Sequence, residues 1–211
     1  MNEKFQNLIT KYPDLEITLP AIEAAYTLLE TTYAQGGKLL ICGNGGSAAD
    51  SEHIVGELMK GFTLSRPVPH DVRQRLTSAF PDNGRYLADH LQGALPAISL
   101  VSQTGLITAF ANDVAGDMIF AQQVYGYGRS GDVTWGISTS GNSRNVIHAL
   151  QVGQAVGLKT LGLTGQSGGQ MAALCDVTIC VPWRETADVQ ERHLAIYHAL
   201  CTALEVRFFG A

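Results

Sequence analysis

The spacing of apolar positions changes along the chain and predicts where helices and strands alternate. Over residues 15–35 the apolar positions recur at helical intervals, and the Gly36-Gly37 pair ends the pattern. A shorter helix is expected before it, over residues 3–11. Continuously apolar runs predict strands at residues 38–43, 96–101, 132–139, 159–165 and 177–182. Helical periodicity predicts helices at residues 47–59, 84–95, 105–127, 144–156, 168–175 and 189–209.

Buried strands that are separated by helices form parallel sheets with both faces covered. The five expected strands therefore predict an α/β fold, a three-layer α/β/α sandwich with a five-stranded parallel sheet. The 211 residues fit one domain, with extra N-terminal helices over about 1–36 and an insertion over about 66–95. A hydrophobic fraction of 45%, a charged fraction of 16% and 23 glycines exclude a disordered chain or a coiled coil.

The net charge of −5, without any run of like charges, argues against direct binding of nucleic acid or of an anionic membrane. No apolar run reaches the ~18 residues of a membrane span, and residues 1–20 lack the pattern of a secretory leader. We therefore expect a cytoplasmic protein that acts on a small molecule. Four cysteines without C-x-x-C spacing are expected to be buried thiols: Cys42, Cys175, Cys180 and Cys201.

A glycine-rich turn, GNGGS, follows the first expected strand and opens the next helix. Gly43, Gly45 and Ala48 match the dinucleotide pattern G-x-G-x-x-A, but no strand ends in an acidic residue ~20 positions later. No lysine follows the glycines, which excludes a nucleoside triphosphate loop. No nucleotide cofactor is expected. The turn is either a tight connection capped by Ser47 or one wall of a different ligand site.

A second loop, STSGNS, carries four hydroxyls between a buried strand and the helix after it, from Ser138, Thr139, Ser140 and Ser143. Hydroxyls and free backbone N–H groups at a helix start suit an anion. Arg144 is the only cation of the loop. The expected ligand is therefore a phosphate monoester held by neutral donors, and the alternative is a polar turn without a ligand.

His53 and Glu57 lie four residues apart on the helix behind the glycine turn, so their side chains share one face. On the last helix Gln190 and His198 are eight residues apart, near one face. Such a set could bind a metal or act as general acid and base, if the two helices meet. By itself, a helical His-x-x-x-Glu is more often a surface pair. Three further side chains are interpreted as structural or core residues: His148, His193 and Tyr197.

The two loops, GNGGS and STSGNS, resemble those of the sugar isomerase (SIS) domain family, and the spacing of the later motifs resembles its phosphoheptose isomerases. The resemblance covers nearly the whole chain. It implies a five-stranded parallel sheet between helices and a homotetramer. It also implies that His53, Glu57, Gln190 and His198 bind a divalent metal, commonly zinc, with Glu57 as catalytic base and His198 as acid.

The resemblance further implies a sugar phosphate substrate, held by the hydroxyl loop, the glycine turn, an Asn-Asp pair and the last helix. The implied substrate-binding residues are Asn44, Gly45, Gly46, Ser47, Asn112, Asp113, Ser138, Thr139, Ser140, Ser143 and Gln190. The implied reaction is a ketose–aldose isomerisation, from sedoheptulose 7-phosphate to D-glycero-D-manno-heptose 7-phosphate through an enediol. The alternative is a SIS-domain adaptor without activity, of the type that associates with a replication initiator. Glu57 and His198 favour the enzyme, because such adaptors typically replace them.

Two features depart from the family pattern. Lys60 precedes Gly61, where family members often have a glycine followed by arginine or lysine. Residues 66–95 form a segment about twenty residues longer than in the bacterial enzymes that the chain resembles, and it includes a helical-looking HDVRQR stretch. This insertion could cover the site, change the substrate or extend the tetramer interface.

Overall fold

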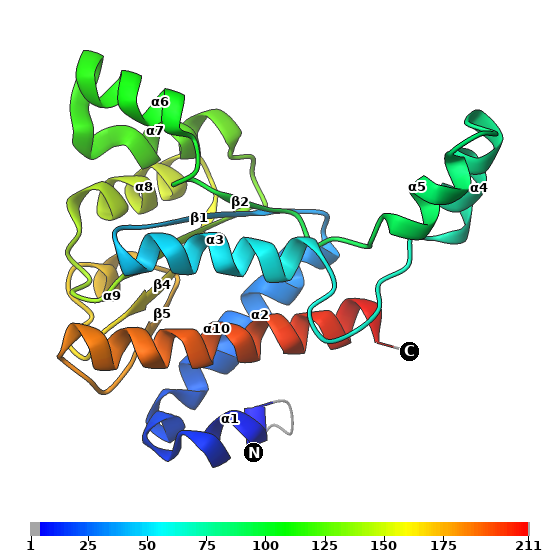
Figure 1. Cartoon of the computed structure of the whole chain (residues 1–211). Coiled ribbons are helices and arrows are strands. Elements are labelled where there is room, and N and C mark those ends of the chain that lie inside the picture. Colours follow the sequence, from blue (N-terminus) through cyan, green and yellow to red (C-terminus); the bar gives the residue numbers. More distant parts are fainter. Residues whose placement is uncertain (1–4, 211) are drawn as a thin grey trace.

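The computed structural model describes residues 5–210, which form helices around one sheet (Figure 1). The elements are α1 (Gln6–Lys11), the 3₁₀ helix η2 (Pro13–Thr18), α2 (Leu19–Ala34), β1 (Leu39–Gly43), α3 (Gly46–Met59), α4 (His70–Ala79), α5 (Gly84–His90), β2 (Ala97–Ser99), α6 (Thr104–Phe110), the π-helix η3 (Ala111–Ala115), the 3₁₀ turn η4 (Gly116–Met118), α7 (Ile119–Tyr127), β3 (Val133–Ser138), α8 (Arg144–Ala155), β4 (Lys159–Thr164), α9 (Met171–Leu174), β5 (Val177–Cys180) and α10 (Thr186–Phe209). No described helix combines the length and apolar character needed to cross a lipid bilayer.

The sheet has five parallel strands in the order β2-β1-β3-β4-β5, which confirms the expected sheet. β1 lies next to the centre, where Leu39 is paired with Ala97 of β2 on one side and with Val133 of β3 on the other. Because all strands run in one direction, the loops that follow them lie along one edge of the sheet. The glycine turn follows β1 and the hydroxyl loop follows β3, so the two are neighbours.

Helices cover both faces of the sheet, which confirms the three-layer sandwich (Figure 1). Alternate residues of β1 point to opposite faces: Leu39 and Ile41 join the core under α1, α2, α3 and α10, whereas Leu40 and Cys42 join the core under α7, α8 and α9. All four cysteines are free thiols. Two of them, Cys42 and Cys201, are buried as expected, while Cys175 and Cys180 are half-buried.

The prediction of a single helix over residues 105–127 is wrong. The segment forms α6, η3, η4 and α7 instead, and the break comes at Ala115, whose φ of −162° and ψ of 125° are extended. Asn112, Asp113 and Gly116 around this break have low helix propensity, so regular helical hydrogen bonding is weakest here. The Asn112-Asp113 pair therefore lies exposed in the short π-helix η3, just before the break.

Other helix boundaries differ from the expected ones by a few residues. The helix expected over 84–95 ends at His90, because the backbone becomes extended at Leu91, and residues 91–96 are not helical. The last helix begins earlier than expected, at Thr186, after an extended Glu185. The first expected helix corresponds to α1, which begins at Gln6, and the first two residues of its expected range lie outside the described residues.

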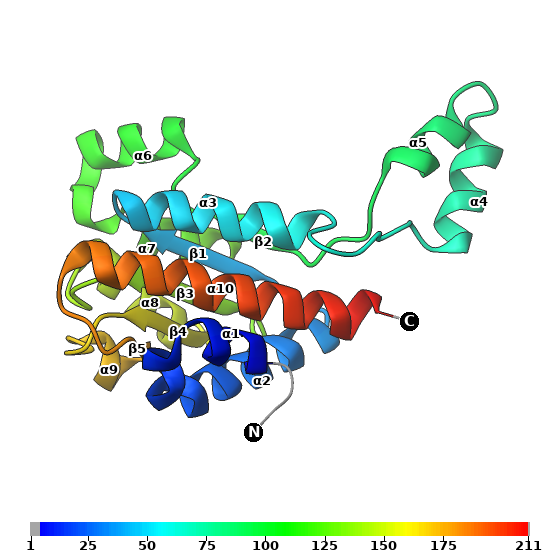
Figure 2. The same ribbon diagram turned by 60° about the horizontal axis from the view of Figure 1, so that its bottom comes forward.

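Residues 66–95 contain α4 and α5, which form an arm that stands away from the sheet and its helices (Figures 1 and 2). The HDVRQR stretch is helical as expected, within α4. The two helices pack on each other, with the backbone of Gly84 against that of Leu76 and an ion pair between Arg73 and Asp89. α4 has no buried residue, which fits a helix covered by one other helix.

His193 on α10 is fully buried, and neither of its ring nitrogens makes a hydrogen bond of ordinary geometry. Burial lowers the pKa of this imidazole from 6.5 to about 4, although the neighbouring Thr164 backbone opposes the shift. His193 is therefore a neutral side chain of the core, as the sequence analysis interpreted it.

This lowered pKa makes the stability of the fold depend on pH. The unfolded chain binds a proton at His193 below about pH 6.5, whereas the folded chain resists it until about pH 4. The free energy of unfolding should therefore fall, by up to about 3 kcal/mol, as the pH falls through this window. Urea unfolding at pH 7.5 and pH 4.5 should show a smaller loss for His193→Met than for the wild type. The exposed His70→Gln is the control, and an equal loss in all three proteins would contradict the prediction.

Candidate active site

The hydroxyl loop lies at the carboxyl end of β3 and leads into the N-terminus of α8. The Ser138 Oγ lies 2.9 Å from the Ser143 Oγ and 3.4 Å from the Ser140 Oγ, so three of the predicted hydroxyls meet. Thr139 and Ser140 line a cavity of about 460 Å³. The first turn of α8 adds backbone N–H groups without helical partners and the positive end of the helix dipole. This arrangement suits an anion such as a phosphate ester.

The glycine turn is held against the hydroxyl loop by a pair of side-chain amides. The Asn44 Nδ2 donates to the Asn145 Oδ1 at 2.8 Å, and the Asn145 Nδ2 donates back to the Asn44 Oδ1 at 2.9 Å. Asn145 was not predicted from the sequence. It lies in the first turn of α8, two residues after Ser143, so the hydroxyl loop indicated this region of the chain but not this contact. α3 begins at Gly46, so Ser47 lies inside its first turn and is not the cap.

α10 also reaches the glycine turn. A Cβ on Gly46 would lie only 2.4 Å from the Gln190 Nε2, so the amide of this α10 residue packs directly against the backbone of the turn. The turn, the start of α8 and the start of α10 thus meet at one edge of the sheet. Of the predicted residues, Asn44, Gly46 and Gln190 lie at this junction.

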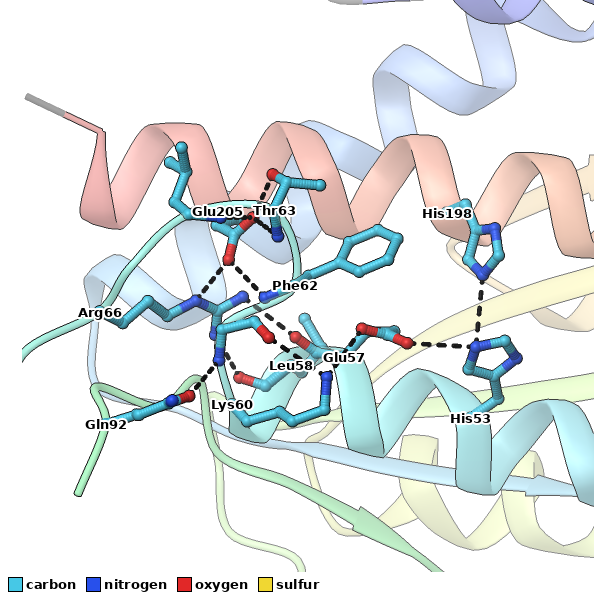
Figure 3. Close-up of polar contacts among 12 residues, drawn as sticks. His53, Glu57, Leu58, Lys60, Phe62, Thr63, Arg66, Gln92, His198 and Glu205 are labelled. Carbon is cyan, nitrogen blue, oxygen red and sulfur yellow. Dashed lines mark hydrogen bonds and ion pairs between the residues drawn. The ribbon is translucent and has the colours of Figure 1, made fainter. Parts of the chain in front are cut away.

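Further along α3 and α10, three of the four predicted metal ligands converge (Figure 3). The His53 Nε2 lies 3.2 Å from the Glu57 Oε1 on its own helix and 3.4 Å from the His198 Nε2 across from it. The Glu57 side chain is 12% exposed, whereas that of His53 is 43% exposed, so the carboxylate is shielded while the histidine remains accessible. The two helices therefore meet as the prediction of an acid/base set required.

Tyr197 takes part in this cluster, so its interpretation as core packing was incomplete. Its side chain is buried, but the hydroxyl lies 2.9 Å from the His53 Nδ1 and donates to the Asp50 Oδ1 at 3.2 Å. Asp50 was also missed. It lies one helical turn before His53 and shares its face, which was the available signal. Asp50 and Tyr197 fix the orientation of the His53 ring.

The environment of the cluster shifts two pKa values in opposite directions. Burial raises the pKa of Asp50, while the Tyr197 hydroxyl and His53 oppose the shift. Burial, followed by the neighbouring His53, lowers the pKa of His198, and the Glu57 carboxylate opposes it. His198 is therefore neutral at pH 7, and one of its ring nitrogens can accept a proton.

The hydrogen bond at the His53 Nδ1 determines whether the Nε2 of a neutral ring carries a proton or a lone pair. Because the Tyr197 hydroxyl donates to Asp50, it accepts the proton of the His53 Nδ1. In a neutral ring the Nε2 then presents a lone pair toward the acceptor oxygen of Glu57. Two lone pairs at 3.2 Å repel each other unless a proton or a metal cation lies between them.

The spacing of these atoms bears on metal binding. Tetrahedral zinc ligands at their usual bond lengths lie about 3.3 Å from one another. The His53–Glu57 and His53–His198 separations of 3.2 and 3.4 Å match this value pair by pair. Within residues 5–210, however, no three His, Cys, Asp or Glu side chains together form a preformed metal centre. The amide of Gln190 lies against Gly46.

Lys60, which departs from the family pattern, lies beside the Glu57 carboxylate. Its Nζ donates to the Glu57 Oε2 at 3.4 Å and to the Gly61 carbonyl at 3.2 Å (Figure 3). The Lys60 side chain is 60% exposed, so it can move toward a ligand. It places a positive charge next to the Glu57 carboxylate.

Other predicted residues lie apart from this cluster. His53 lies seven residues beyond Gly46 on α3, roughly 10 Å along the helix, so the cluster and the glycine turn are separate parts of the surface. Asn112 donates to Asp113 at 2.8 Å, and both side chains are exposed beyond α6. Their part in binding a sugar stays a prediction.

Comparison with known proteins assigns the chain to a family. The model of the SIS domain family matches residues 15–87 and 87–165. The chain is 41% identical to the phosphoheptose isomerase of Trichlorobacter lovleyi, over 93% of this chain and 87% of the relative. Its structure is similar to that of phosphoheptose isomerase from Neisseria gonorrhoeae, with 34% identity, coverage of 95% and 94%, and a TM-score of 0.73. For the enzyme from Francisella tularensis these values are 29%, 96% and 95%, and 0.75. The chain therefore belongs to the SIS domain family and, within it, to the phosphoheptose isomerases.

Proposed function

We propose that the protein interconverts sedoheptulose 7-phosphate and D-glycero-D-manno-heptose 7-phosphate. The observation that supports it most is the convergence of Glu57, His53 and His198 between α3 and α10. The phosphoheptose isomerases to which the chain is similar bear the name of this activity. A ketose–aldose isomerisation needs one group that moves a proton between two carbons and another that moves a proton between two oxygens.

Glu57 is the group that moves the proton between the two carbons. Its carboxylate removes a proton from C1 of the ketose and returns it to C2, with an enediol between the two steps. His198 is the group that moves a proton between the two oxygens. Its neutral imidazole can accept the proton of the C1 hydroxyl while it donates one to the C2 oxygen. Lys60 next to Glu57 stabilises the negative charge that develops on the enediol.

The donor set also suits a divalent metal such as zinc. His53, Glu57 and His198 would hold it. That Gln190 is a further ligand stays a prediction, because its amide lies against Gly46. The ion would remove the repulsion between the lone pairs of His53 and Glu57. When bound, it supplies polarisation of the substrate carbonyl. Asp50 and Tyr197 hold the His53 ring in the tautomer that leaves its Nε2 free to bind.

The phosphate group of the substrate would bind the hydroxyl loop, and the glycine turn with Asn112 and Asp113 would contact the sugar. In one chain the hydroxyl loop and the Glu57 cluster lie apart. We therefore propose a homotetramer, in which a second copy brings the two parts of the site together. Light scattering of the purified protein measures the number of copies.

Purified protein incubated with sedoheptulose 7-phosphate should form the heptose 7-phosphate, as followed by mass-resolved chromatography. Dialysis against a chelator should lower the turnover by at least about tenfold, and added zinc should restore it. The metal content of the protein, measured before and after dialysis, should change in parallel. Binding of the ketose phosphate without turnover would instead support an adaptor. Full activity of the metal-free protein would contradict the proposal that a bound metal takes part in the reaction.

A further inference from the structure

A buried carboxylate on α10 organises the segment that follows α3. The side chain of Glu205 is fully buried, and it accepts five hydrogen bonds from four residues of the loop (Figure 3). They come from the Phe62 N (2.8 Å), the Thr63 N (2.8 Å), the Thr63 Oγ1 (2.6 Å), the Leu64 N (3.1 Å) and the Arg66 Nε (2.8 Å). The loop is therefore attached to α10 at one point.

Arg66 continues this network to the helix that carries the base. Its side chain is fully buried. Besides its bond to Glu205, it donates from Nη1 to the Leu58 carbonyl at 2.8 Å and from Nη2 to the Glu57 carbonyl at 3.0 Å. The last carbonyls of a helix have no partner within the helix, so this guanidinium completes the end of α3. It contacts the backbone of Glu57 itself.

The same network reaches His198. Glu205 lies seven residues after His198 on α10, two turns along the same face. The ring of Phe62, whose N–H is bonded to Glu205, lies 5.4 Å from the His198 ring (Figure 3). The Arg66–Glu205 ion pair thus connects the backbone of Glu57 to the residues around His198.

Stability alone does not explain this arrangement. Burying two charges costs several kcal/mol in lost hydration, and apolar residues of similar size often stabilise a core as well or better. Burial alone would raise the pKa of Glu205. The hydrogen bonds from Thr63, Phe62 and Arg66 outweigh this effect and lower the pKa to about 2. The ion pair is therefore fully charged at neutral pH, and each of its hydrogen bonds has a fixed direction. That directionality positions the loop and both helices.

We propose that Arg66 and Glu205 are positioning residues for the reaction: together they fix the end of α3, with Glu57, relative to the part of α10 that carries His198. The inference rests on the proposed function for the roles of Glu57 and His198. A shift of about 1 Å between catalytic groups can lower a rate about 100-fold, so small losses of order in this network should be measurable.

The test compares Glu205→Gln and Arg66→Lys with a matched control, Asp132→Asn. The Asp132 carboxylate is also buried and accepts hydrogen bonds from the Lys38 N, the Lys38 Nζ and the Arg129 N, but none of these partners belongs to α3, α10 or the loop after α3. We expect kcat to fall about 10- to 100-fold in both network variants, with KM within about twofold of the wild type. Asp132→Asn should keep its kcat at an equal loss of stability, measured by urea unfolding.

Activity losses no larger than those of Asp132→Asn at equal stability would overturn the proposal. If Glu205→Gln does not fold, Thr63→Val takes its place in the kinetic test. This variant removes a single hydrogen bond to Glu205 and should still lower kcat severalfold. A wild type without turnover would refute the proposed function alone. The imidazole NMR resonances of His53 and His198 then test the positioning: they should shift in Glu205→Gln and not in Asp132→Asn, and unchanged resonances would overturn it.

Discussion

Glu57→Gln is expected to lower kcat by about 10²- to 10⁴-fold while the protein stays folded and still binds the ketose phosphate. The amide keeps the shape of the side chain and its place next to His53, but it cannot accept the C1 proton. Its cost in stability should be small, because Lys60 and His53 are exposed or half-exposed partners. Steady-state kinetics with sedoheptulose 7-phosphate, and calorimetric binding of the same ligand, separate these effects.

Glu52→Gln is the control for this variant, because Glu52 lies on the same helix and is exposed. The amide can still accept the hydrogen bond that the Ser102 hydroxyl donates to this side chain. Glu52→Gln should therefore react like the wild type. A Glu57→Gln protein within a few-fold of the wild-type kcat would show that another group removes the proton. The buried carboxyl of Asp50 would then be the first residue to test.

Burial on both faces explains why the sheet could be predicted from the sequence. Every residue of β1 and of β3 is buried, so both strands are mostly apolar and carry no charged residue. Helices between the strands then require parallel pairing. The irregular segment around Ala115 could not be predicted in the same way. Its apolar residues keep a helical period, and the break depends on the weak propensities of a few polar and glycine residues.

The cluster between α3 and α10 could be predicted only within each helix. The four-residue spacing of His53 and Glu57 places them on one face, and the structure has them 3.2 Å apart. The same reasoning cannot identify partners that are distant in the chain. Tyr197 bonds to His53 across 144 positions and Arg66 to Glu205 across 139, and no periodicity relates such pairs. That α3 and α10 meet was implied by the family resemblance and not by the spacing.

The Ser138→Ala, Ser143→Ala double variant is expected to raise KM roughly 100-fold with a much smaller change in kcat. Hydrogen bonds to a charged group contribute about 1.5–3 kcal/mol each, and two of them would be lost where the phosphate binds. The Oγ atoms lie 2.9 Å apart at the start of α8, so one phosphate can accept from both, and removing both leaves no unpaired partner. The exposed Ser130→Ala is the control and should keep the wild-type KM. Because the lost contacts are to the phosphate, the double variant and the wild type should bind unphosphorylated sedoheptulose equally weakly. An unchanged KM for the phosphorylated sugar would mean that the phosphate binds elsewhere, and the cavity beside Thr139 and Arg184 would be the next place to test.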